Sequence, residues 1–137
     1  MDKIPFALAL ILVTVSLSGC AGDDGPSAYV DEVHVFIDGT FSDETICQQA
    51  VVIESGSYYT CTFTLNSDAW IGIDLVIASG SPAVDLITMD DLNFNQWEDG
   101  DAHYYLENVS DFGTNGGSYS SDGDLEAGDY VVVVSNR

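Results

Sequence analysis

The chain has 137 residues, of which 46% are hydrophobic, and its 23 acidic side chains against two basic ones give a formal net charge of −21. Because nucleic-acid phosphates are bound through Lys and Arg, this charge excludes DNA and RNA as partners, and it also excludes attachment to anionic lipids through a basic patch. The hydrophobic fraction predicts a folded domain rather than a disordered acidic chain.

The first residues predict a secretory signal. Lys3 supplies a positive start, and residues 4–17 are apolar apart from Thr14 and Ser16. An apolar run of this length suits the core of a signal peptide, about 7–15 residues, better than a membrane span of about 20. We therefore expect an apolar signal helix within residues 1–19.

The signal ends in Leu17-Ser18-Gly19-Cys20, which resembles a bacterial or archaeal lipobox. The resemblance implies cleavage before Cys20, a lipid on its thiol, and a protein held at the cell membrane on the extracytoplasmic side. The alternative is an uncleaved anchor in which Cys20 has no role. After cleavage the chain would keep 22 acidic residues and Arg137, and residues 20–28 would tether a domain formed by residues 29–137.

Period-two alternation after the tether predicts β-strands. It first separates two faces of one strand, with Val33, Val35 and Ile37 on one face and His34, Phe36 and Asp38 on the other. Residues 46–55 and 58–66 predict two more strands around Gly56. In the second of these, Tyr59, Cys61, Phe63 and Leu65 share one face, and Thr60, Thr62 and Thr64 share the other.

Residues 69–79 and 83–89 continue the strand pattern, which a helical insert then interrupts. Asp90 is placed to cap a short helix that Gly100 ends. The polar, glycine-rich residues 111–124 predict a long loop, and residues 130–135 predict a last strand whose valine run requires burial on both faces. Six or seven short strands predict an all-β fold, a single antiparallel, jelly-roll-like β-sandwich with one helical insert.

Cys47 and Cys61 remain as a pair once Cys20 carries a lipid. On the oxidising side of a membrane such a pair predicts a disulfide, which for this loop length stabilises by about 3 kcal/mol. We expect the bridge to tie a hairpin or its ends. The competing interpretation, a pair of metal thiolates, has no CxxC motif or nearby histidine to support it.

Two predicted strands contain a recognisable pattern, with Val84, Asp85 and Leu86 in a middle strand and Leu125, Gly128, Tyr130, Val132, Val134 and Asn136 in the closing strand. The pattern resembles that of GOLD/emp24-type and bacterial pre-peptidase C-terminal (PPC) sandwich modules. The resemblance implies a sandwich fold and a non-catalytic role in binding, secretion or assembly. Such modules accompany enzymes, and we expect no enzyme domain attached to this one.

Catalytic motifs are sparse. There is no G-x-S-x-G, and no Ser or Cys stands with His and a carboxylate at a recognisable spacing. A mature chain without lysine excludes Schiff-base and P-loop chemistry. His34, His103, Met89 and a cysteine invite a copper site, but Cys61, Met89 and His103 fall on separate predicted elements. We therefore expect a protein that is not an enzyme.

Calcium is the most credible metal, because hard cations select carboxylates on glycine-containing loops. Two segments supply them, with Glu98, Asp99 and Asp101 in one and Asp122, Asp124, Glu126 and Asp129 in the other. Neither is an EF-hand. The alternative is that Asp-Gly pairs form turns and acidic residues coat the surface. No other cofactor is expected.

Trp97, Tyr104 and Tyr105 flank the first acidic segment, a composition typical of carbohydrate or protein-partner sites. Asn108 begins an N-glycosylation sequon. Together these features predict a membrane-anchored lipoprotein whose acidic β-sandwich is a non-catalytic binding or accessory module of the cell envelope. The alternatives are a calcium-stabilised carbohydrate-binding domain, an envelope hydrolase that uses paired carboxylates, and a coat or filament subunit.

Overall fold

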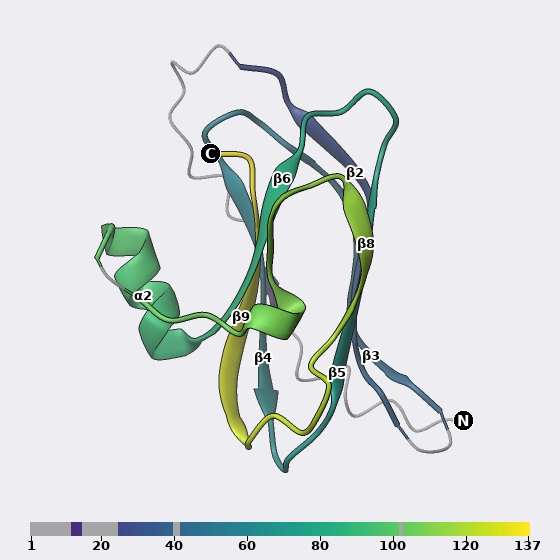
Figure 1. The fold of residues 1–137 in the computed structure, drawn as a ribbon, viewed down its shortest axis with the longest axis vertical. Coiled ribbons are helices and arrows are strands. Elements are labelled where there is room, and N and C mark those ends of the chain that lie inside the picture. The colour runs from purple at the N-terminus through teal and green to yellow at the C-terminus, as the bar shows by residue number, and fades with distance from the viewer. Residues whose placement is uncertain (1–11, 15–24, 40–41, 102) are drawn as a thin grey trace.

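The computed structural model describes residues 12–14, 25–39, 42–101 and 103–137. Sheet A contains, in spatial order, β1 (Leu12–Thr14), β4 (Tyr58–Leu65), β9 (Gly128–Ser135), β6 (Val84–Asp90) and β7 (Asp111–Thr114). Sheet B contains β3 (Glu44–Ile53), β2 (Ala28–Ile37), β5 (Ile71–Ile77) and β8 (Gly116–Ser120). Helix α2 (Asp91–Asp99) and the 3-10 turn η1 (Glu107–Val109) complete the described elements. Figure 1 shows the sheets as two layers with α2 outside sheet A, which confirms the predicted antiparallel sandwich with a helical insert.

The predicted signal segment is described only at Leu12–Thr14, where the chain forms β1 rather than a helix. This strand pairs antiparallel with β4 at the edge of sheet A, with Val13 opposite Cys61. The rest of the predicted signal and Cys20 lie outside the described residues. Among the described helices, none combines the length and the apolar character that a membrane crossing requires.

The core lies between the sheets and follows the predicted alternation. Val33 and Val35 of β2 are fully buried, and so are Tyr59 and Cys61 of β4. Ala28, which the sequence assigns to the tether, is also fully buried because β2 begins there and its small side chain faces the core. The alternating apolar residues of both sheets therefore form one continuous core, as expected for facing inner surfaces.

Helix α2 covers the outer face of sheet A. The Asp90 carboxylate caps its first turn by accepting a hydrogen bond from the Asn93 N–H at 2.8 Å, and Gly100 ends the helix in the left-handed conformation with φ 81°. Both ends are as predicted. Phe94 and Trp97 pack against a second cluster formed by Tyr58, Ile87, Met89, Val131 and Val133.

The valine run at residues 131–134 is buried on both faces, as predicted. Val132 and Val134 point into the core between the sheets, whereas Val131 and Val133 lie in the cluster against α2. The helix therefore explains why this strand contains consecutive apolar residues: each face of sheet A packs against another layer.

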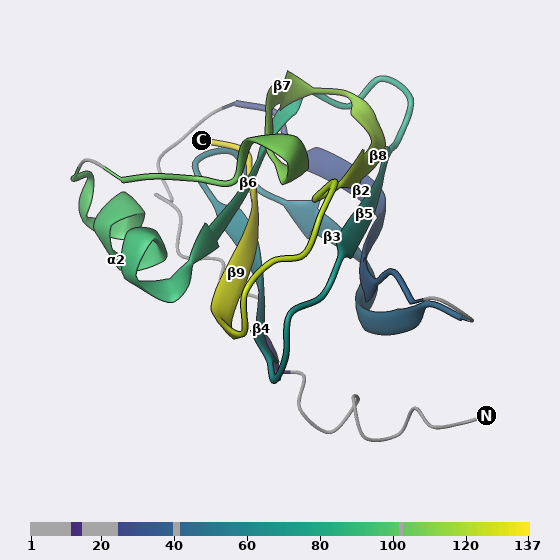
Figure 2. The ribbon, with the colours of Figure 1, turned by 60° about the horizontal axis from the view of Figure 1, so that its bottom comes forward.

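The predicted loop at residues 111–124 is wrong for most of its length. It contains β7, which pairs with β6, and β8, which pairs with β5, so the chain passes from sheet A to sheet B around Asn115 (Figure 2). Glycines with positive φ, including Gly113 and Gly116, accompany these strands. Backbone pairing holds these polar segments at the sheet edges, which side-chain periodicity could not reveal.

The Cys47–Cys61 disulfide is confirmed, with the two Cα atoms 6.5 Å apart. The expectation that it ties a hairpin is wrong, because β3 and β4 belong to different sheets. A turn at residues 54–57, in which the Ser57 N–H donates to the Glu54 carbonyl at 2.9 Å, carries the chain from sheet B to sheet A. The bridge therefore fastens one sheet to the other.

Candidate ligand-binding face

The outer face of sheet B lies on the side of the molecule away from α2 (Figure 1). The helix contacts β6 and β9, both in sheet A. In β2, Val33 and Val35 are buried between the sheets, so the alternation of the strand turns His34 and Phe36 outward. This outer face combines polar and aromatic side chains.

The strand register aligns polar residues across all four strands of sheet B. One row runs through Gln48 on β3, His34 on β2, Asp74 on β5 and Ser118 on β8. The next row on the same face runs through Thr45, Phe36, Gly72 and Ser120. Residues from four separate segments of the chain therefore meet on one surface.

Hydroxyl groups hold the two ionisable side chains of the first row. Thr45 Oγ1 lies 2.9 Å from His34 Nε2, and Ser118 Oγ donates to Asp74 Oδ1 at 2.8 Å. Between these pairs, His34 Nδ1 and Asp74 Oδ2 are 3.9 Å apart, which is too far for a direct hydrogen bond. The His34 ring and the Asp74 carboxylate are thus oriented, while a polar gap remains between them.

A half-buried aromatic side chain lies beside this gap. A Cβ atom on Gly72 would come within 2.4 Å of Phe36 Cζ, so the Phe36 ring rests directly over the β5 backbone at the glycine. The ring centroids of Phe36 and His34 are 4.9 Å apart. Only glycine at position 72 allows the ring to lie this close to the sheet.

The far end of the same face is more apolar. Tyr29 of β2 is 54% exposed, and Val52 and Val76 on the adjacent strands are exposed as well. A shallow depression here is lined by Tyr29, Val30, Asp31, Ala50, Val51 and Val52. An irregularity in β2 between Val30 and Val33 lets both valines face the core and leaves Tyr29 outward.

The structure separates the predicted aromatic site into different packing environments. Trp97 forms an edge contact with Tyr58 at 5.0 Å between ring centroids, and the Arg137 guanidinium lies 4.6 Å above its ring. Tyr105 instead packs edge-on against Phe112 at 5.2 Å, and Tyr104 is 83% exposed. Trp97 therefore packs α2 onto sheet A. Ligand binding by Trp97, Tyr104 and Tyr105 stays a prediction.

The predicted calcium ligands lie at the end of α2 and after it (Glu98, Asp99, Asp101), after β8 (Asp122, Asp124) and at the start of β9 (Asp129). Within the described ranges, no group of three or more His, Cys, Asp or Glu side chains is arranged to hold a metal ion. Glu98 accepts a hydrogen bond from the Tyr58 hydroxyl, and Asp129 accepts one from Thr64 at 2.6 Å. Calcium binding stays a prediction.

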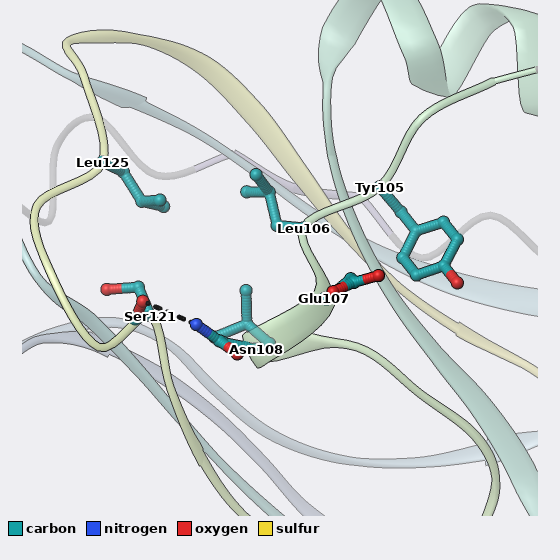
Figure 3. A pocket seen from close by; sticks show the side chains of 7 residues that line it. Tyr105, Leu106, Glu107, Asn108, Ser121 and Leu125 are labelled. Atoms are coloured by element: carbon teal, nitrogen blue, oxygen red, sulfur yellow. Dashed lines mark hydrogen bonds between the residues drawn. The ribbon is translucent and has the colours of Figure 1, made fainter.

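A pocket beside η1 is lined in part by Asn108 and Val109 of the predicted sequon (Figure 3). Its lining residues are Tyr105, Leu106, Glu107, Asn108, Val109, Ser121 and Leu125. Asn108 Nδ2 donates to the Ser121 carbonyl at 3.3 Å, and Ser110 Oγ accepts from the Thr88 N–H at 2.9 Å. These contacts tie η1 to the sandwich. Glycosylation of Asn108 stays a prediction.

The Thr45–His34–Asp74 order of hydroxyl, imidazole and carboxylate resembles that of a catalytic triad, but the distances do not favour catalysis. The orienting bond from imidazole to carboxylate that such triads use is absent at 3.9 Å, and Ser118 bonds the carboxylate rather than the imidazole.

Sequence reasoning missed this face as a site. The alternation around His34 and Phe36 indicated their shared exposure, but nothing local linked them to Asp74 or Ser118. Comparisons with protein-family models, curated proteins and solved structures found no match. The resemblance to GOLD and PPC modules stays a prediction.

Proposed function

We propose that this chain is an extracytoplasmic lipoprotein, anchored through Cys20, whose acidic β-sandwich is a non-catalytic binding module of the cell envelope. The observation that carries the binding role is the outer face of sheet B, where hydroxyl groups orient His34 and Asp74 beside the Phe36 ring. Such convergence of polar groups with an aromatic surface is typical of ligand-binding sites.

The anchoring role is supported by the lipobox-like residues before Cys20 and by the charge of the chain. A domain with a net charge of −21 is repelled by an anionic membrane, so a covalent lipid is the attachment that remains. Eight residue steps separate Cys20 from Ala28, the first residue of β2, and an extended chain of that length spans about 25 Å. The tether would let the domain stand clear of the headgroups.

Anchoring through Cys20 predicts the mass of the mature protein and its loss from the membrane fraction when Cys20 is replaced. Protein isolated from its own membranes should lack residues 1–19 and carry a lipid adduct on Cys20. A Cys20→Ser variant should lack the adduct and leave the membrane fraction, whereas a Ser27→Ala control in the tether should behave as the wild type. Intact-mass spectrometry and fractionation measure both. A wild-type mass that retains residues 1–19 without a lipid would contradict the proposal.

The binding role is tested by capture from envelope extract. The full chain, purified in detergent, should retain an envelope component that the double variant His34→Ala/Asp74→Ala does not retain. An Asp91→Ala control removes an exposed carboxylate on α2 and should retain it normally. Glycans and proteins are both scored. Equal retention by the wild type and the double variant would remove the support for this face.

A further inference from the structure

The gap between His34 Nδ1 and Asp74 Oδ2 has the dimensions of a site for one oxygen atom. An oxygen about 2.8 Å from each atom spans their 3.9 Å separation. When the Thr45 hydroxyl donates to Nε2, the neutral imidazole carries its proton on Nδ1. The gap then presents a donor on one side and an acceptor on the other, which is the complement of a hydroxyl group.

The polar groups around the gap are held in place before any ligand arrives. Ser118 fixes one oxygen of Asp74, and Gln48 Nε2 donates to Glu32 Oε2 at 2.6 Å in the neighbouring position. The face therefore offers planar carboxylate and amide groups in fixed orientations. Pre-oriented partners of this kind reduce the entropy lost on binding.

The Phe36 ring adds a requirement for an apolar surface on the same ligand. The Cζ end of the ring lies over Gly72, next to the His34 ring. A ligand that fills the gap with a hydroxyl must place its adjacent atoms over or near this ring. A pyranose has both features, because its hydroxyls project from the rim and its C–H groups form an apolar face that packs on aromatic rings.

Charge restricts the ligand further. The chain contains two Lys or Arg residues, Lys3 and Arg137, and Arg137 stacks on Trp97 beside α2, outside sheet A. The candidate face instead carries the carboxylates of Glu32 and Asp74. An anionic ligand would meet repulsion here, and no Lys or Arg among the described residues lies on this face to offset it. A ligand without net charge suits this surface.

From these observations we propose that the outer face of sheet B binds a neutral hexose glycan. One sugar hydroxyl bridges His34 Nδ1 and Asp74 Oδ2, and the sugar ring packs on Phe36. This assignment rests on the binding role proposed above and names its ligand class.

Tyr29 extends the proposed site along the sheet. It lies seven residues before Phe36 on the same strand and face, which corresponds to about 20 Å. A disaccharide at the gap would not reach Tyr29, whereas a longer oligosaccharide lying along β2 would. We therefore expect chain length to increase affinity, and we expect this increase to depend on the Tyr29 ring.

Titration of the full chain, held in a detergent without a sugar headgroup, tests the proposal. The probes are gluco-, manno- and galacto-configured disaccharides and hexasaccharides, with oligomers of the matching uronic acids as anionic counterparts. Calorimetry gives the affinity, and amide chemical shifts locate the site. We expect at least one neutral hexasaccharide to bind, with shifts at residues 34, 36, 74 and 118, and the uronic-acid oligomers to bind more weakly.

Variants separate the contributions of the contacts. Asp74→Ala should weaken binding about tenfold or more, because it removes a charge-assisted hydrogen bond, and Ser118→Ala should weaken it by a smaller factor. Gly72→Ala should displace the Phe36 ring and also weaken binding. Tyr29→Ala should affect the hexasaccharide but not the disaccharide. Asp91→Ala is the control, and thermal melts establish that each variant is folded.

The proposal is overturned if folded wild-type protein binds none of the neutral oligosaccharides, if the uronic-acid oligomers bind as well or better, or if Asp74→Ala and Ser118→Ala both leave the affinity unchanged. Envelope capture distinguishes a wrong ligand class from the absence of a binding role. Retention that depends on His34 and Asp74, without neutral glycan binding, means that the ligand class is wrong and the binding role stands. If neither capture that depends on His34 and Asp74 nor neutral glycan binding is observed, both the binding role and the ligand class are wrong.

Discussion

At the scale of single residues, two tyrosines of the core contribute in opposite directions. Tyr59 is fully buried, and its hydroxyl has no hydrogen-bond partner among the described residues. The Tyr130 hydroxyl, by contrast, donates to the Glu126 carbonyl at 2.6 Å and holds the turn that leads into β9. A buried polar group without a partner costs about 1–3 kcal/mol, whereas a satisfied one contributes about 1 kcal/mol.

Phenylalanine substitutions at these positions should therefore change stability with opposite signs. Tyr59→Phe should raise the free energy of unfolding by about 1 kcal/mol, and Tyr130→Phe should lower it by about 1 kcal/mol. Urea unfolding followed by circular dichroism measures both, with each variant serving as the control for loss of a tyrosine hydroxyl. A destabilised Tyr59→Phe variant would show that this hydroxyl has a partner in the folded protein.

These two tyrosines and Tyr119 make the free energy of unfolding depend on pH in the alkaline range. Burial is the main cause that raises the pKa of Tyr59, of Tyr119 and of Tyr130, with nearby carboxylates adding to the rise for Tyr119 and Tyr130. Because each pKa is higher in the folded state than in the unfolded state, the protonated tyrosines favour folding. Their contribution to the free energy of unfolding is complete below the unfolded-state pKa, about 10, and is lost as the pH rises through the folded-state pKa values.

We expect the free energy of unfolding to fall as the pH increases above about 10. The fall should be shallower in Tyr59→Phe than in the wild type, because one of the linked ionisations is removed. Urea unfolding across this pH range measures the slope. Identical slopes for the two proteins would show that Tyr59 ionises alike in the folded and unfolded states.

At the scale of the elements, the two sides of the sandwich are closed by different means. Around Asn115 the chain passes directly from β7 in sheet A to β8 in sheet B. On the other side, the turn after β3 and the Cys47–Cys61 bridge join the sheets. The disulfide therefore acts where β3 and β4 would otherwise be connected only through the turn and core packing.

Removal of the bridge should destabilise the domain without changing its ligand face. Cys47→Ala/Cys61→Ala should lower the free energy of unfolding by about 3 kcal/mol, as expected for a loop of this length. Wild-type protein unfolded with reductant present is the matched comparison and should show a similar decrease. Equal stability with and without the bridge would mean that packing alone holds the sheets together.

Element prediction from the sequence succeeded where local chemistry decides the structure. The Asp90 cap and the Gly100 terminus define α2, and alternation defines β2 and β4. It failed for β7 and β8, because their polar and glycine-rich residues form strands only by pairing with β6 and β5. Pairing with distant strands leaves no local periodic pattern in such short edge segments.

At the scale of the whole molecule, the net charge of −21 opposes folding through self-repulsion. Added salt screens this repulsion, since the Debye length falls from about 10 Å at 0.1 M to about 3 Å at 1 M. We therefore expect the melting temperature to rise between these two NaCl concentrations. A flat or falling melting temperature would show that the carboxylates are spaced widely enough not to oppose folding.

The same measurement separates general screening from the predicted calcium site. CaCl2 at matched ionic strength should raise the melting temperature no further if calcium acts only by screening. A larger rise in calcium that is lost in Asp122→Ala/Asp124→Ala, with Asp91→Ala unaffected, would support specific binding at the segment after β8.

The amino-acid sequence by itself determined the features that depend on neighbouring residues: the class of fold, the helix boundaries, the inner faces of β2 and β4, and the choice of Cys47 and Cys61 as a pair. Only the tertiary structure decided that this pair joins two sheets and that His34, Asp74 and Ser118 share one row. The physical reason is strand register, because which residues stand opposite each other is set by long-range pairing and packing, and a shift of one residue would turn His34 to the other face.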